Sequence, residues 1–373
     1  MEKEFFIQVK KDNAIHQKKT LYFIGLIKYI SLIIIIRVHI HSYHKELFYA
    51  IRACELLFIS SGFLVGYNYI DKENPNTFIY AFKYYYKHLR NCYPLYLINF
   101  FSGVINHKNE IKYNLTSIEL FLINIFMLQV WSRRRQLVSF FNGISWFLHD
   151  LLICYFFSPL LLNGINSIKK SLILFLVFAL TRILLEEFIH LGALNIFDTH
   201  IHDGPFVRII EFYLGMLIIP TFLKFHTFLD RYKNKTFFKI ILTIFPILMT
   251  AILFSFLKDN KTFLCCYYVL IFCLYIFIIG YEYGYLPDLI SNKLIRIIMN
   301  PQMEMYLSHI SINRIIKKSK LLLFFFNFMN KEFKFIIKLL IIFLFSMLYK
   351  ILLKDRLSKC MDKLLYFFNQ IIN

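Results

Sequence analysis

The sequence has few of the residues that build turns and linkers. It contains 11 glycines and 8 prolines among 373 residues. It has no Gly/Ser-rich linker, no internal repeat and no polar stretch longer than about 25 residues. These absences argue against an appended soluble module. We therefore expect one membrane domain over residues 21–353, preceded by an N-terminal segment at 1–20 and followed by a tail at 354–373.

Cysteine usage argues against a disulfide framework and against a zinc site. The seven cysteines are an odd number, and four of them lie inside apolar runs: Cys154, Cys265, Cys266 and Cys273. A disulfide framework needs pairs, and a zinc site needs closely spaced ligands. We interpret these cysteines as small buried apolar side chains, and we expect no metal.

Apolar residues dominate what is present. The chain is 58% hydrophobic, with 44 Phe and 25 Tyr. Apolar runs of about 18 residues recur with few interior charges, as a hydrocarbon layer about 30 Å thick requires. The sequence thus predicts an all-α fold, a polytopic transmembrane helix bundle of about ten or eleven membrane helices. The expected spans are 21–40, 47–68, 91–106, 118–132, 145–163, 171–188, 206–223, 238–257, 262–281, 297–315 and 333–353.

The formal charge of +20 suggests nucleic acid as a partner, but the distribution of the cations does not. The basic residues form short clusters between apolar runs, whereas a nucleic-acid site needs them along one polar surface. We therefore expect no nucleic acid, and we interpret the clusters as membrane flanks. Four lysines before the first span place the N-terminus in the cytoplasm by the positive-inside rule: Lys10, Lys11, Lys18 and Lys19.

Two further features concern the ends of the chain. No small-residue cleavage pattern follows the first apolar run, which therefore predicts an anchor and not a removable signal. The tail from Lys354 to Asn373 carries apolar residues at helical spacing, which indicates an amphipathic helix at the membrane interface.

Ionisable residues inside apolar spans are costly and mark the first place to look for function. In the first span Lys28 and His39 lie eleven residues apart. Eleven residues make about three helical turns, so one face presents both side chains about 16 Å apart along the axis. His39 has two interpretations, a catalytic group or an interfacial histidine at the end of the helix, where His41 and His44 follow.

Six short blocks of sequence stand in order along the chain. They are Lys28 with His39, Phe58-Ile59-Ser60-Ser61-Gly62-Phe63-Leu64, Lys87 to Tyr96 with Arg90 inside it, Trp146-Phe147-Leu148, Arg208-Ile209-Ile210-Glu211-Phe212 with Gly215, and Glu304-Met305-Tyr306-Leu307-Ser308-His309. In this order the blocks resemble acyltransferase family 3, the polytopic acyltransferases of cell-surface carbohydrates. Lys28 and Lys87 stand where that family carries arginine, which removes the bidentate contacts that a guanidinium makes.

The resemblance implies an acyltransferase that transfers groups other than amino-acyl groups. The donor would be acetyl-CoA or another acyl-CoA, and the acceptor would be a carbohydrate hydroxyl. The catalytic residues would be His39, Lys28 and Glu211. The donor would be bound by Lys87, Arg90 and Arg208. Further pore candidates are Ser61, Trp146, Glu304 and His309.

Several of these assignments have structural alternatives. Acyl transfer to a hydroxyl needs a base, and imidazole is the usual one near neutral pH. A carboxylate could hold the tautomer of His39, and the candidates by motif are Glu55, Glu211 and Glu304. Arg208 and Glu211 are three residues apart on one helix face, so they could instead neutralise each other.

The basic group and the second histidine also have alternatives. Lys83, Lys87 and Arg90 could bind the phosphates of the donor just before a helix, or they could be ordinary flanking charges. His309 could belong to the pore or could donate an interhelical hydrogen bond.

A glycolipid or polysaccharide transporter or flippase is the alternative function. It should show an inverted repeat or Gly/Pro-broken helix pairs, which the sequence lacks. A scaffold would not need His, Glu and Arg at membrane depth. The Lys, Ile, Asn and Phe usage suits an AT-rich bacterial genome, so we expect the bacterial cytoplasmic (inner) membrane.

Overall fold

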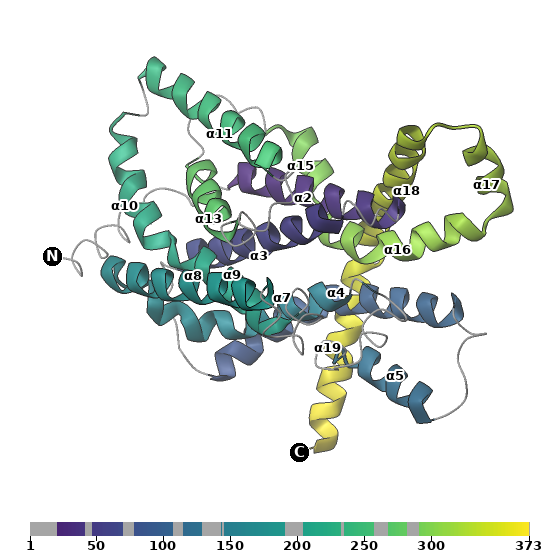
Figure 1. The fold of residues 1–373 in the computed structure, drawn as a ribbon. Helices are drawn as coiled ribbons and strands as arrows, with labels where there is room; N and C mark the ends of the chain where they lie inside the picture. Colours follow the sequence, from purple (N-terminus) through teal and green to yellow (C-terminus); the bar gives the residue numbers. More distant parts are fainter. Residues whose placement is uncertain are drawn as a thin grey trace. The chain divides into compact units, whose positions relative to one another are not determined.

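The computed structural model describes most of the chain as helix. The described residues are 21–41, 47–69, 78–106, 115–128, 143, 145–190, 204–232, 235–256, 268–281 and 291–372. They contain α-helices, one short 3-10 helix and no strand (Figure 1). The predicted all-α class is therefore confirmed for this part of the chain. The N-terminal segment 1–20 lies outside it.

The helices follow the apolar runs of the sequence. In chain order they are α2 (Tyr22–His41), α3 (Leu47–Tyr69), α4 (Phe78–Asn106), α5 (Leu115–Ile125), α7 (Ser145–Leu161), η3 (Leu162–Ile165), α8 (Ile168–His190), α9 (Pro205–Leu217), α10 (Ile219–Asp230), α11 (Thr236–Phe256), α13 (Tyr268–Ile279), α15 (Lys293–Met299), α16 (Gln302–Lys318), α17 (Lys320–Asn327), α18 (Lys331–Leu352) and α19 (Lys354–Ile372).

Five helical stretches in the described residues are long and apolar enough to cross a membrane. They are Tyr22–His41, Tyr49–Tyr69, Ser145–Ile165, Pro205–Leu229 and Lys331–Leu352. A stretch of about 20 apolar residues matches the thickness of a hydrocarbon core. These helices indicate a membrane protein, but the expected ten or eleven spans are not confirmed.

Four predicted spans have different bounds in the structure. The span expected at 118–132 corresponds to α5, which ends at Ile125. The span expected at 297–315 is broken at Asn300 and Pro301 between α15 and α16.

The other two spans involve α4 and the junction of α9 with α10. The span expected at 91–106 is the second half of α4, which begins at Phe78, because residues 78–93 contain neither glycine nor proline. Lys83, Lys87 and Arg90 thus lie within a helix and not before one. The span expected at 206–223 is divided at Ile218, where α9 ends and α10 begins with Pro220 in its first turn.

The chain divides into two compact units. Unit 1 comprises Met1–Ser31, Phe48–Phe82 and Ile153–Met299, and unit 2 comprises Leu32–Leu47, Lys83–Leu152 and Asn300–Asn373. The division falls inside α2, so that Lys28 belongs to unit 1 and His39 to unit 2. The single membrane domain predicted over 21–353 stays a prediction.

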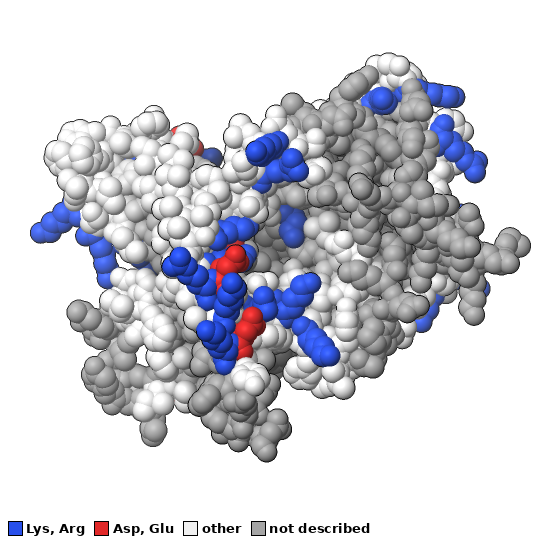
Figure 2. Space-filling model, turned by 180° about the vertical axis from the view of Figure 1, so that it is seen from behind, with Lys and Arg blue, Asp and Glu red and all other residues white. Residues whose placement is uncertain are grey.

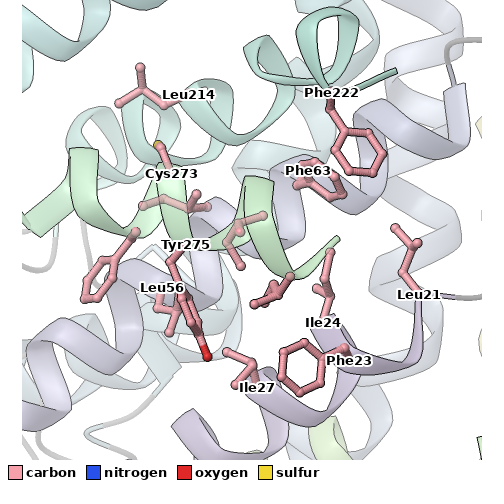
Figure 3. Close-up of a cluster of buried hydrophobic side chains, with 14 of the residues drawn as sticks. Leu21, Phe23, Ile24, Ile27, Leu56, Phe63, Leu214, Phe222, Cys273 and Tyr275 are labelled. Carbon is pink, nitrogen blue, oxygen red and sulfur yellow. The ribbon is translucent and has the colours of Figure 1, made fainter. Parts of the chain in front are cut away.

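Unit 1 packs around an apolar core from α2, α3, α9, α10 and α13 (Figure 3). The rings of Phe63 and Phe222 meet edge to face, with their centroids 5.0 Å apart. Two glycines let α3 and α9 approach closely. A Cβ atom at Gly62 would lie 1.7 Å from the carbonyl oxygen of Phe212, and one at Gly215 would lie 2.0 Å from that of Ile59. The glycines of two sequence blocks therefore set the contact between these helices.

In unit 2, α18 packs on both α16 and α19, and hydrogen bonds join α19 to α4. The hydroxyls of Ser308 and Ser346 lie 3.2 Å apart between α16 and α18. On its other side α18 exposes apolar side chains four residues apart: Ile336, Leu340, Leu344 and Leu348. Water disfavours such a stripe, whereas lipid accommodates it. The exposed face of α18 thus fits a membrane-spanning helix.

Candidate active site

His39 is paired with His309 in unit 2. The Nδ1 atom of His39 lies 3.0 Å from Nε2 of His309, and the two rings stack with centroids 5.2 Å apart. His39 is half-buried near the end of α2, and His309 is fully buried in α16. Two residues separated by 270 positions in the sequence therefore form one hydrogen-bonded pair.

A backbone carbonyl fixes the direction of this hydrogen bond. Nδ1 of His309 lies 2.7 Å from the carbonyl oxygen of Tyr306, which can only accept, so this nitrogen carries the proton. In a neutral imidazole the other nitrogen then accepts, so Nδ1 of His39 donates to Nε2 of His309. The lone pair of His39 is therefore on Nε2, and His39 makes no further hydrogen bond to the described residues.

Aromatic packing holds the pair in place. The ring of Tyr306 contacts that of Phe147 on α7, with centroids 4.7 Å apart, and lies 5.8 Å from the ring of His309. Trp146 packs beside Phe147 with centroids 6.0 Å apart. The Trp146 block and the block that ends at His309 thus meet in unit 2. Trp146 contributes to the packing that supports the histidine pair.

The carboxylate expected beside His39 is not its partner in the structure. Glu304 accepts a hydrogen bond from the ammonium of Lys354 at 2.7 Å, in an ion pair that is mostly buried on the Glu304 side. The Nδ1 position of His39 is taken by His309 instead. The imidazole of His309 therefore lies beside Nδ1 of His39, where the sequence predicted a carboxylate.

Lys28 lies in unit 1 and bonds to Ser61. Its ammonium donates to the Ser61 hydroxyl at 3.0 Å, and this hydroxyl donates to the carbonyl of Leu57 at 2.6 Å. Two of the predicted site residues are therefore in direct contact between α2 and α3. The contact leaves further N–H groups of the Lys28 ammonium to act as donors.

A buried network of three arginines and three glutamates joins α3, α8 and α9 in unit 1. Arg52 binds both oxygens of Glu55, at 2.7 and 2.8 Å, and binds Glu186 at 3.1 Å. Arg182 binds all three carboxylates, those of Glu186 at 2.5 Å and of Glu55 and Glu211 at 3.1 Å. Arg208 binds Glu211 at 2.5 Å. The formal charges of these six described side chains cancel one another.

This network favours the structural interpretation of Arg208 and Glu211. The two side chains neutralise each other, as their spacing of three residues allowed. The Arg208 guanidinium also lies over the ring of Phe58, 5.3 Å from its centroid. Their predicted roles in catalysis and donor binding stay predictions. The sequence interpretation did not include Arg52, Arg182 and Glu186, although their spacing within apolar helices was the available signal.

Two of the three predicted donor-binding cations, Lys87 and Arg90, lie on α4 in unit 2, whereas Arg208 lies on α9 in unit 1. Arg90 donates to Asp362 of α19 at 2.9 Å, and the Tyr86 hydroxyl donates to the same carboxylate at 3.1 Å. Burial and this hydrogen bond raise the pKa of Tyr86, so the hydroxyl keeps its proton at neutral pH. Lys87 is exposed. Arg90 is therefore paired with a partly exposed carboxylate, whereas Lys87 remains open to an anion.

The described ranges contain no group of three or more His, Cys, Asp or Glu side chains that could hold a metal ion. A scan against models of protein families, a search of curated proteins and a search of solved structures each gave no match to this chain. The resemblance to acyltransferase family 3 therefore rests on the six sequence blocks.

Proposed function

We propose that this protein is a membrane-embedded O-acyltransferase. It would move an acyl group, with acetyl as the first candidate, from acyl-CoA to a hydroxyl of a cell-surface or lipid-linked carbohydrate. The observation that carries this proposal is the hydrogen-bond chain from His39 through His309 to the Tyr306 carbonyl. The chain directs the lone pair of His39 to Nε2, which is the form that a general base needs.

The chemistry follows from that lone pair. Nε2 of His39 accepts the hydroxyl proton while the hydroxyl oxygen bonds to the carbonyl carbon of the thioester. The tetrahedral oxyanion then collapses, the C–S bond breaks, and the leaving thiolate takes the proton from His39. The products are the ester and free CoA, and His39 returns to its neutral form. His309 holds the imidazole ring and accepts the hydrogen bond from the Nδ1–H group of His39 throughout.

The oxyanion needs a positive or hydrogen-bonding partner. Lys28 is the cation among the residues proposed as catalytic, but it lies about 16 Å from His39 along α2, so it does not serve the oxyanion formed beside Nε2 of His39. Ser61 orients the Lys28 ammonium from α3. Lys28 as a catalytic residue stays part of the proposal.

The remaining parts of the proposal concern topology. The bundle would have about ten or eleven spans in the bacterial inner membrane, with the N-terminus in the cytoplasm. Acyl-CoA would then reach the protein from the cytoplasm, and the support is the cluster of lysines before α2.

Mass spectrometry of surface glycans tests the function directly. Cells with the gene should carry a glycan with an added acyl mass, cells without it should lack that mass, and a plasmid copy should restore it. The His39→Ala form, at a matched membrane level, should not restore it. An unchanged glycan profile in all strains, or full restoration by the variant, would overturn the proposal.

A further inference from the structure

The last helix of the chain lies against the predicted donor-binding helix. Ser358 of α19 donates to the backbone carbonyl of Arg90 at 3.2 Å, and Asp362 accepts from both Arg90 and Tyr86. Ser358 and Asp362 are four residues apart, so they lie on one side of α19. That side of α19 therefore faces α4.

Cations remain exposed on both helices beside this contact. On α4, Lys83 and Lys87 are four residues apart on one face. On α19, Arg356, Lys359 and Lys363 repeat at intervals of three and four, which also places them on one face. Figure 2 shows Lys and Arg side chains gathered around acidic ones on one side of the molecule.

Ion pairing does not cancel this charge. Asp362 is engaged by Arg90, and Glu304 is engaged by Lys354. Five exposed cations are left against the exposed carboxylate of Asp355. Like charges on one helix face repel one another, and an anion of several charges removes the repulsion.

We propose that α4 and α19 together form the site for the phosphate groups of the acyl-CoA donor, an inference that rests on the proposed function. Coenzyme A carries a diphosphate and a separate 3′-phosphate, and Lys83 and Lys87 on α4 offer only two exposed cations to these groups. The stripe on α19 supplies the second set of cations. Arg90 and Tyr86, held by Asp362, lie where the two helices meet.

Direct binding of CoA tests the site without acyl transfer. The full-length protein in nanodiscs is titrated with CoA and with 3′-dephospho-CoA, for the parent and for three double variants. These are Lys83→Gln with Lys87→Gln on α4, Lys359→Gln with Lys363→Gln on α19, and Lys317→Gln with Lys318→Gln on α16 as a control of equal charge change. The pairs on α4 and α19 should each raise the Kd for CoA about tenfold, and the control should leave it unchanged.

Further measurements separate the outcomes. Arginine in place of both α19 lysines should keep the affinity, since it keeps the charge, and the Kd for CoA should rise with salt. Binding to vesicles that contain phosphatidylglycerol is measured in parallel. If the α19 pair changes only vesicle binding and binds CoA like the parent, α19 serves lipid headgroups and this inference is wrong. If the parent itself does not bind CoA, the proposed function fails as well.

Discussion

The two units differ in how completely their charged and polar side chains are paired and buried. In unit 1, six ionised side chains pair among themselves, and each is between 0% and 4% exposed. In unit 2, His39 keeps an unused lone pair, and the Arg90–Asp362 pair is about two-fifths exposed. A group whose hydrogen-bonding atoms are all used by other protein atoms stabilises the fold. A group that still has a lone pair or an exposed charge can act on a ligand. The comparison separates the buried ionic network of unit 1 from the candidate base His39 in unit 2.

The first prediction tests the buried ionic network of unit 1, where we expect the largest effect on stability. Replacing Arg182 with Met removes the partner that three carboxylates share. Loss of one partner from a buried ion pair costs roughly 3–5 kcal/mol, because the remaining charge stays buried. We expect the variant to accumulate poorly and to unfold at a clearly lower temperature, as followed by fluorescence-detected size-exclusion chromatography after heating.

A charge-neutral double variant is the matched control for Arg182→Met. Arg182→Met with Glu186→Leu removes one cation and one anion, and it leaves Arg52 with Glu55 and Arg208 with Glu211. Buried ion pairs can often be replaced by apolar side chains at little cost. The double variant should therefore be more stable than the single one. If the single and the double variant were equally unstable, an unpaired buried charge would not be the cause of the instability.

The second prediction concerns the open group in unit 2. His39→Ala should lower acyl transfer by about 10²–10⁴-fold, since a general base contributes that much. Its accumulation in the membrane should match the parent, because His39 belongs to no charge network. The readout is acyl incorporation into the surface glycan at matched protein levels.

His41 provides the comparison for His39. It lies at the end of the same helix, with its ring 5.7 Å from that of Phe335. His41→Ala should retain most of the activity, and the same is expected of His44→Ala, although His44 lies outside the described residues. Activity near the parental level in His39→Ala would remove His39 from the mechanism.

The third prediction assigns His309 a positioning role. His309→Ala leaves Nδ1 of His39 without an acceptor, and a lost hydrogen bond of this kind should lower the rate by about ten- to a hundredfold. His309→Gln can still accept from His39 through its amide oxygen, so part of the rate should return. Thermal unfolding of both variants is measured as well. If stability alone separates them from the parent, His309 is a packing residue.

Sequence patterns predicted the helices better than their contacts. Apolar runs predicted α2, α3 and α18 within about two residues, because a span of lipid imposes its own length. The apolar run did not predict the start of α4, because residues 78–90 are basic and aromatic and precede that run. The division at Ile218 was missed because the apolar run continues through it.

The site depended on contacts that no local pattern encodes. The partner of His39 lies 270 positions away, and nothing near His39 indicates that it is a histidine. Parts of the ionic network could be predicted from the sequence. Arg182 with Glu186 and Arg52 with Glu55 have the spacing of helical ion pairs inside apolar segments. The closure of three such pairs into one network needs the close contact of α3 and α9 that Gly62 and Gly215 permit.

The smallest expected effect comes from breaking an ion pair in unit 2. Asp362→Asn removes one charge from the pair with Arg90, as Arg182→Met does in unit 1. Exposed pairs contribute about 0.2–1 kcal/mol, so stability should hardly change. The amide oxygen of Asn can still accept from Arg90 and Tyr86, which keeps α19 in place.

The proposed donor site also predicts the direction in which Asp362→Asn changes the KM for acyl-CoA. Without the negative charge of Asp362, Arg90 is free to attract phosphate, so the KM for acyl-CoA should fall, by at most about fivefold. The limiting rate should stay constant, because contacts far from the thioester bind the ground state and the transition state alike. Initial rates over a range of acyl-CoA concentrations measure both constants. A higher KM would mean that Asp362 helps to bind the donor, and the contrast between closed and open charges would then not extend to this pair.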